Sequence, residues 1–341
     1  MSDDLDLHYK TVTKAITDGR VVFFLGAGAN LCGRPQDENW QRGQHNYLPS
    51  GIELAEYLAD EFSYPPSKEL VDCPALQKKV EVLIKSKDLA RVSQFVDVMN
   101  GDGPLYDKLH DIFNHDYPPT DVHKFLAKLP AALREKGCDF CHQLIVTTNY
   151  DDVLERAFYD ENESFDLVYY EAKGQQRGKF IHRKYVMSSK DKPVWPLHDV
   201  EAYLIEKPKE YFELALDQRT VILKIHGTVN RPTVNFDQDS YVVTEDHFID
   251  YLTHTEINDL LPKTLAVKLY RSHFLFLGYA LRDWNLRVIL YRLWQQRELS
   301  FKSWAIQLEP DAIDQEFWKR YDVEFKNIRL ENYIATLNTR I

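Results

Sequence analysis

Several continuous apolar runs, each ending in a polar motif, constrain the fold of this chain more than any other feature. Four of the runs lead into the motifs GAGAN, TTNYDD, IHGT and LGYALRD, and FKSWAIQL predicts a fifth strand. Helical patterns separate the runs, as a parallel sheet requires, because crossover helices cover both of its faces. The sequence therefore predicts an α/β fold built on a Rossmann-like, doubly wound and mainly parallel sheet.

Amphipathic spacing predicts the helices between these strands. Residues 8–19 carry an apolar stripe, and LPSGIELAEYLADEF offers Ser50 as an N-cap with Glu53 three positions later. LARVSQFVDVM is the clearest part of a helical region at 74–113, and PPTDVHKFLAKLPAAL predicts another helix after two prolines. The order of strand, loop and helix fits the predicted fold.

We expect a single domain over residues 1–341 that contains two smaller units. A helical subdomain is predicted at 62–135. An inserted subdomain is predicted at 159–218, because this segment is rich in charge and tyrosine and separates two core strands. The sequence has no internal repeat or heptad array that would indicate a solenoid or a coiled coil.

Composition limits the class of protein. The 341 residues are 44% hydrophobic and carry a net charge of -11, which predicts a globular chain whose surface repels nucleic acid. The N-terminus has no apolar leader, no stretch reaches the roughly eighteen apolar residues of a membrane helix, and the few cysteines suit a reducing compartment. We therefore expect a cytoplasmic protein that binds neither membranes nor, directly, nucleic acid.

The GAGAN motif follows the first predicted strand. Gly26 and Gly28 flank Ala27 where backbone amides could approach a pyrophosphate. Leu31 stands where a dinucleotide fingerprint has its third glycine, and no GKS or GKT follows, which excludes an ordinary P-loop. A tight turn between strand and helix explains the glycines equally well. Since ligands of doubly wound sheets bind outside the carboxyl ends of the strands, we expect all four polar motifs to converge on one crevice.

The TTNYD motif places an amide and a carboxylate at the end of the second core strand. Asn149 and Asp151, beside Thr148, could bond ribose hydroxyls or a carboxamide, which need donors and acceptors at fixed positions. An Asx-turn at Asn149 and a helix cap at Asp151 are the purely structural alternative.

The other two motifs each place a glycine at a strand end. His226 in IHGT is the strongest candidate for a general base, because imidazole takes a proton near neutral pH. In LGYALRD, Gly278 and Tyr279 are better placed than Arg282 to meet an adenosine, and Arg282 could pair with Asp283.

The cysteines do not complete a metal site. Cys138 and Cys141 have the spacing of half a zinc ribbon, but the second pair is missing. Two incidental thiols are the favoured interpretation, and a redox pair or a partial metal site stays open. The histidines form no metal-ligand pattern.

Taken together and in this order, GAGAN, TTNYD, KIHGT and FLGYALRDWNL resemble the sirtuin-like family, in particular the branch of bacterial anti-phage defence proteins that destroy NAD. The resemblance spans about residues 15–310. It implies that the Gly-Ala-Gly loop holds the NAD phosphates, that the Asn-x-Asp motif contacts nicotinamide and ribose, and that the histidine is the catalytic base. The implied catalytic residues are Asn149 and His226, and the implied cofactor-binding residues are Gly26, Ala27, Gly28, Asn30, Thr148, Asp151, Gly278 and Tyr279.

Two departures from the family's pattern bear on the reaction. Deacylating sirtuins carry a four-cysteine zinc module after the histidine, but this chain has no cysteine beyond Cys141, so no zinc is expected. Asn30 stands where the family usually has a hydroxyl, at the start of a cofactor-binding loop that would run to Ser50. Without the zinc module water is the expected acceptor, which favours hydrolysis of NAD to nicotinamide and ADP-ribose over deacylation.

The resemblance also implies regulation. An enzyme that depletes NAD must be restrained, so we expect a homo-oligomer controlled by assembly or by a partner. A HerA-type ATPase is favoured and a short Argonaute is the alternative; the short stretch after residue 310 leaves little room for a sensor. Two other functions stay open: a protein deacylase or ADP-ribosyltransferase, and a non-catalytic nucleotide-sensing module.

Overall fold

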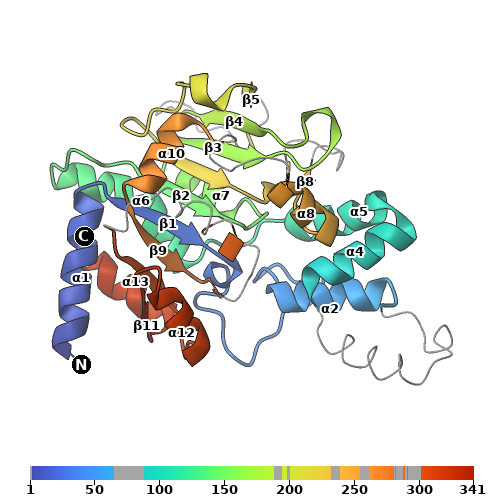
Figure 1. Ribbon diagram of the computed structural model, residues 1–341, viewed down its shortest axis with the longest axis horizontal. Helices are drawn as coiled ribbons and strands as arrows, with labels where there is room; N and C mark the ends of the chain where they lie inside the picture. Colours follow the sequence, from blue (N-terminus) through green and yellow to red (C-terminus); the bar gives the residue numbers. More distant parts are fainter. Residues whose placement is uncertain are drawn as a thin grey trace.

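The computed structural model describes residues 2–64, 88–187, 194–197, 200–231, 239–253, 261–279, 281, 287, 288, 290 and 301–341. Its centre is a nine-stranded sheet of order β11-β10-β9-β1-β2-β6-β3-β4-β5 (Figure 1). The strands of this sheet are β1 (Val21–Leu25), β2 (Leu144–Thr147), β3 (Phe165–Tyr170), β4 (Phe180–Tyr185), β5 (Ala202–Ile205), β6 (Thr220–Lys224), β9 (His273–Leu277), β10 (Ser303–Ile306) and β11 (Val323–Lys326). A separate two-stranded ribbon joins β7 (Gly227–Thr228) to β8 (Ser240–Tyr241).

The strands from β11 to β3 all run parallel, whereas β4 and β5 add an antiparallel edge. β1 lies in the middle of the parallel part. Phe24 pairs with Val146 of β2 on one side and with Phe276 of β9 on the other. The predicted Rossmann-like α/β fold with a mainly parallel sheet is confirmed.

Helices cover both faces of the sheet. They are α1 (Ser2–Thr17), α2 (Gly51–Glu61), α4 (Leu89–Asn100), α5 (Asp102–Phe113), α6 (Asp121–Glu135), α7 (Val153–Asp160), α8 (Glu245–Thr253), α10 (Lys263–Tyr270), α12 (Ala312–Lys319) and α13 (Leu330–Asn338), with 3₁₀ turns η1 (Ala27–Ala29), η3 (Gly174–Gln176) and η4 (Pro208–Glu210). None of the helices in the described ranges is long and apolar enough to cross a bilayer.

β1 is buried on both sides because its side chains alternate between two cores. Val22 and Phe24 belong to the core shared with α8, α10 and α12, and Phe23 and Leu25 belong to the core shared with α1, α6, α7 and α13. A third core joins α2, α4 and α5 to the residues around β8. Figure 1 shows α2, α4, α5 and α8 gathered near the carboxyl end of β1. These helices enclose the edge of the sheet where the polar motifs lie.

The predicted helix starts agree with the structure at two places. Ser50 caps α2 by a capping box, in which its hydroxyl accepts from the Glu53 amide and the Glu53 carboxylate accepts from the Ser50 amide. Thr120 caps α6 directly after the two prolines. The first helix differs from the prediction, because α1 begins at Ser2 rather than at residue 8.

The segment 159–218 contributes β3, β4 and β5 to the main sheet. The sequence did not predict these strands, because charged residues interrupt their apolar pattern. In β3, Asp166 is fully buried and accepts from Arg219 at 3.0 Å. The charge that made this segment look separate is thus partly neutralised inside the sheet. The division into subdomains at 62–135 and 159–218 stays a prediction.

Candidate active site

A cavity of about 430 Å³ lies at the carboxyl ends of β1, β2 and β6. This volume is in the range of ligand-binding clefts. Polar motif residues line one part of it and apolar side chains line the rest. The lining residues are Ala27, Asn30, Pro49, Ser50, Gly51, Leu54, Asp88, Leu89, Ala90, Phe113, Thr148, Asn149, Tyr150, Asp151, His226, Val243 and Phe248. The structure therefore brings GAGAN, TTNYD and IHGT together, as their positions predicted.

The glycines of GAGAN lie against the loop that follows β9. Gly28 donates from its amide to the Gly278 carbonyl at 2.9 Å, and Gly26 donates to the Leu277 carbonyl at 3.2 Å. A Cβ on Gly28 would lie 2.7 Å from the Gly278 oxygen, which is closer than side chains tolerate. The two loops can touch only because both carry glycine.

This contact changes what the GAGAN amides can offer a ligand. The amides of Gly26 and Gly28 are taken by the β9 loop, and that of Asn30 is bonded to the Ala27 carbonyl at 3.1 Å. The amide of Ala27, a residue exposed in the cavity, has no partner among the described residues. A phosphate held by this loop would therefore meet Ala27 first, and the assignment of Gly26 and Gly28 as phosphate ligands stays a prediction.

A buried chain of amides and one carboxylate crosses the floor of the cavity. The side chain of Asn30 donates from Nδ2 to Asp151 Oδ2 at 2.8 Å and accepts at Oδ1 from Asn149 Nδ2 at 3.4 Å. Asn149 Nδ2 also donates to the Gly26 carbonyl at 3.2 Å. Both uses of Nδ2 leave Asn149 Oδ1 without a partner in the described part of the chain, available as an acceptor at the cavity wall.

Asp151 is held on both carboxylate oxygens. Oδ2 accepts from Asn30, and Oδ1 accepts from the Val153 amide at 3.1 Å, at the start of α7. The carboxylate is 4% exposed. The structural alternative for this residue, a helix cap, is thus part of its role, and Asp151 is better placed to orient Asn30 than to reach far into the cavity.

His226 lies at the far wall of the cavity, packed edge-on against Phe248 at 5.2 Å between ring centroids. Its Nε2 is buried and has no hydrogen-bond partner among the described residues. Burial lowers the pKa of His226 to about 3, so the imidazole is neutral near pH 7. Burial is the cause of this shift, and it places the pKa of His226 below the near-neutral range expected from the sequence.

The last motif, LGYALRD, contacts a residue that lines the cavity. Tyr279 donates from its hydroxyl to Thr148 Oγ1 at 2.8 Å, and neither Gly278 nor Tyr279 lines the cavity. Gly278 has a left-handed backbone with φ of +67°. The predicted contact with adenosine stays a prediction, and Arg282 and Asp283 lie outside the described residues.

The loop between GAGAN and α2 is tied down by one carboxylate. Glu53 binds the Arg34 guanidinium and accepts from the amides of Trp40 at 2.7 Å and Ser50 at 2.8 Å. Burial alone would raise the pKa of Glu53, but these hydrogen bonds, led by that from Arg34, lower it to about 2. The cavity wall at Pro49, Ser50 and Gly51 is thereby fixed to α2.

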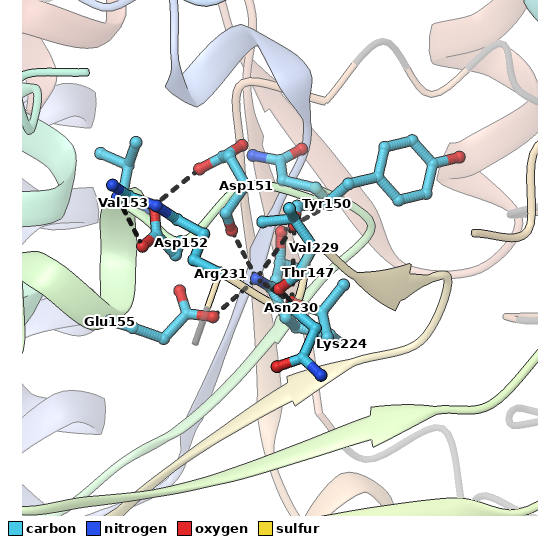
Figure 2. Close-up of polar contacts among 12 residues, drawn as sticks. Thr147, Tyr150, Asp151, Asp152, Val153, Glu155, Lys224, Val229, Asn230 and Arg231 are labelled. Atoms are coloured by element: carbon cyan, nitrogen blue, oxygen red, sulfur yellow. Dashed lines mark hydrogen bonds and ion pairs between the residues drawn. The ribbon is translucent and has the colours of Figure 1, made fainter. Parts of the chain in front are cut away.

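The sequence reading assigned no role to Lys224, the last residue of β6. Figure 2 shows its ammonium amid acceptors from the loop after β2 and from α7. The sequence did contain a signal that this residue has a role: it is a lysine within the apolar run VILKIHG, and a charge in a buried strand requires partners.

Cys138 and Cys141 stand apart from this site in sequence, whereas buried Cys32 follows GAGAN by two residues, and these three described cysteines form no disulfide. Cys138 and Cys141 lie between α6 and β2, and the Cys141 thiol donates to the Cys138 carbonyl at 3.0 Å. Within the described ranges, no group of three or more His, Cys, Asp or Glu side chains is arranged to hold a metal ion. Cys73 and His198 lie outside the described residues.

Comparison with known families decides the lineage. The model of the SIR2-like domain family matches residues 143–326, more than half of the chain. The chain belongs to the SIR2-like family. The SIR2-like match includes Asn149, Asp151, His226 and Gly278, and GAGAN lies before it in the sequence but beside it in space.

Curated relatives of this SIR2-like chain carry names from defence and NAD⁺ hydrolysis. It is 22% identical to "Defense-associated sirtuin 2" of Bacillus subtilis over 94% of this chain and 24% of the relative. It is 25% identical to "NAD(+) hydrolase ThsA" of Enterococcus faecium over 94% of this chain and 51% of the relative, and 23% identical to the ThsA of Bacillus cereus over 86% and 44%. The chain spans about half or less of the length of these relatives.

Proposed function

We propose that this chain is an NAD⁺ glycohydrolase that cleaves NAD⁺ with water to nicotinamide, ADP-ribose and a proton. The observation that carries the proposal is the convergence of Asn149, Asp151 and His226 with the GAGAN loop on one cavity. The names of the ThsA relatives support the same reaction. The cavity combines fixed polar groups with an apolar wall, as a site for a dinucleotide with a flat aromatic ring requires.

Cleavage of the bond between nicotinamide and ribose builds positive charge on the ribose ring, as in other glycosyl transfers. We assign to Asn149 Oδ1 the task of accepting a hydrogen bond from the attacking water or from a ribose hydroxyl. The neutral Nε2 of His226 polarises a ribose hydroxyl or takes a proton from water. Burial keeps this imidazole unprotonated, so its lone pair is free to accept a hydrogen bond from either group beside the growing ribose cation.

Asp151 acts through Asn30 in this proposal. Its carboxylate fixes the Asn30 amide, and the Asn30 carbonyl in turn fixes the Asn149 amide. The oxygen of Asn149 then points in one direction before substrate arrives, which lowers the cost of organising the transition state. Ala27 and the N-terminus of α2 at Gly51 lie on the same cavity and suit the pyrophosphate.

The proposed setting is anti-phage defence inside the cell, with the enzyme as effector. The name of the Bacillus subtilis relative, "Defense-associated sirtuin 2", supports a role in defence. We further propose that the chain acts as a homo-oligomer in the cytoplasm, restrained by a partner. By analogy with other sirtuin-like effectors that partner is a HerA-type ATPase, with a short Argonaute as the alternative.

The direct test is incubation of the purified chain, separated by size into its oligomeric fractions, with NAD⁺. We expect at least one fraction to release nicotinamide and ADP-ribose in equal molar amounts. Asn149→Ala and His226→Ala should abolish the release. His8→Ala is the matched control. His8 is also buried, but it bonds Tyr333 of α13 at 3.1 Å, and neither residue lines the cavity.

Other outcomes would favour other functions. NAD⁺ that stays intact in every fraction would contradict hydrolysis and favour a nucleotide-sensing module. Nicotinamide release that requires an acylated lysine peptide would indicate a deacylase, and transfer of labelled ADP-ribose to protein would indicate a transferase. Equal activity of His226→Ala and the wild type would refute the role of His226.

A further inference from the structure

Lys224 is a buried cation that the proposed reaction leaves unexplained. It ends β6, two residues before His226, and is 1% exposed. Moving an ammonium group out of water is costly unless several acceptors surround it. The retention of a lysine here therefore indicates a set of partners that a neutral side chain could not satisfy.

Its partners come from three different elements. The Lys224 ammonium donates to the backbone carbonyl of Asp151 and reaches that of Tyr150 at 3.4 Å. It also donates to the carboxylate of Glu155, in α7, at 2.6 Å (Figure 2). A further bond of 3.0 Å goes to the hydroxyl of Thr228, in β7. The group thus connects the loop after β2 to the end of β6, and His226 lies in the turn that follows this strand.

We propose that Lys224 is a positioning residue that sets the distance between the Asn149–Asp151 loop and His226. The inference rests on the proposed function, since it assigns Lys224 to that same site. The two carbonyls that Lys224 binds belong to the two residues that follow Asn149 in this loop. When the ammonium holds them, the loop is drawn toward β6, and Asn149 and His226 face the same cavity.

A second bond strengthens this connection. The Tyr150 carbonyl also accepts from the Val229 amide at 2.9 Å, which lies just beyond β7. The loop is therefore clamped at Tyr150 by backbone and side-chain donors on the segment that follows β6. Removal of Lys224 takes away its side-chain donors and leaves the Tyr150 carbonyl with the Val229 amide and the Thr228 hydroxyl at 3.5 Å, so we expect the loop to loosen without unfolding.

The rival explanation is that Lys224 only neutralises Glu155. Burial raises the pKa of Glu155, and Lys224 is the group that opposes this rise. If charge balance were the whole role, removing both charges would restore the protein, because buried pairs can often be replaced by neutral groups at little cost. If the bonds from Lys224 to the loop carbonyls position the loop, a variant without both charges still lacks those bonds.

The experiment compares Lys224→Met with Lys224→Met/Glu155→Gln, each made in the chain of residues 1–341. Lys326→Met is the matched control, because Lys326 is another buried strand-end lysine, paired with Asp4 at 2.9 Å and Glu324 at 2.8 Å in β11. We expect the single variant to lose stability and activity. The double variant should regain most of the thermal stability, while kcat for NAD⁺ stays about 100-fold low with little change in KM, as displacements near 1 Å produce.

A second readout does not depend on catalysis. Amide hydrogen exchange should become faster at Asn149, Val153 and Val229 in the double variant and stay at the wild-type rate in Lys326→Met. A double variant with wild-type kcat, or with unchanged exchange at these amides, would overturn the proposal. If the wild type does not cleave NAD⁺, the proposed function fails, and the exchange rates still decide the role of Lys224.

Discussion

Asn30 and Asp151 are joined by a buried hydrogen bond of 2.8 Å, although they lie 121 positions apart in the sequence. The bond connects the GAGAN loop after β1 to the TTNYD loop after β2. The bond gives a role to Asn30, which stands where the sirtuin-like family usually has a side chain with a hydroxyl group. Only a side chain with both a donor and an acceptor can bridge Asp151 and Asn149 in this way.

Asn30→Ser tests this bridge. The shorter hydroxyl cannot reach both partners, so the Asn149 amide loses its fixed orientation. We expect kcat for NAD⁺ to fall by about 10- to 100-fold and the free energy of unfolding to fall by about 1–3 kcal/mol, the cost of an unmade bond to a buried charge. Gln44→Ala in the same loop, where the side chain is exposed, should match the wild type in both measurements.

Gly278→Ala tests the contact between the β9 loop and GAGAN. A Cβ there would overlap the backbone of Gly28 and Ala29, and the left-handed φ of +67° adds strain of about 1–3 kcal/mol for any other residue. Gly137→Ala provides the control, because Gly137 has a φ of +70° but no neighbouring atom within 4 Å of the added carbon. Chemical denaturation should show a clearly larger loss for Gly278→Ala; equal losses would contradict the close contact.

Glu53→Gln tests the anchor of the loop over the cavity. Hydrogen bonds hold the folded-state pKa of Glu53 at about 2, below its ordinary value of 4.5. The carboxylate therefore stabilises the fold above about pH 4.5, and this contribution is lost as the pH falls toward 2. We expect Glu53→Gln to lower stability and raise KM for NAD⁺ at neutral pH, with the stability difference from wild type shrinking between pH 4.5 and 2. A constant difference over that range would argue against an ionised anchor.

His226 predicts a loss of stability of the same sign, which begins at a higher pH because the ordinary pKa of histidine is 6.5. Burial lowers its folded-state pKa from 6.5 to about 3, so the folded protein favours the neutral ring. The corresponding stability is complete above pH 6.5 and is lost as the pH falls from 6.5 toward 3. As the pH is lowered over this interval, the midpoint temperature of thermal unfolding should therefore fall less steeply for His226→Asn than for the wild type. Parallel curves would mean that the ring is protonated at its ordinary pKa.

The parallel core of the fold could be predicted from sequence because its strands are buried on both faces. VVFFL and HFLFL read as continuous apolar runs, and β1 and β9 lie at those positions. β4 could not be found in this way, because FIHRKY alternates buried and partly exposed positions and carries three basic side chains. Its place depends on pairing with β3, which local pattern does not encode.

The site was predictable only as a set of residues. Position after a strand was enough to bring Asn149, Asp151 and His226 to one edge of the sheet. The direction of each side chain could not be predicted, because it depends on partners such as Asn30 and Lys224 that come from other segments. The low pKa of His226 likewise depends on Phe248 and the other neighbours that exclude water, and these become visible only in three dimensions.

The place of β1 between β2 and β9 has a consequence for biosynthesis. β1 is synthesised before β9, and its GAGAN loop rests on Gly278, 250 positions after Gly28. A nascent or truncated chain without β9 lacks the surface against which that loop is held. With the proposed activity, we expect a translation product that stops before β9 to leave NAD⁺ intact.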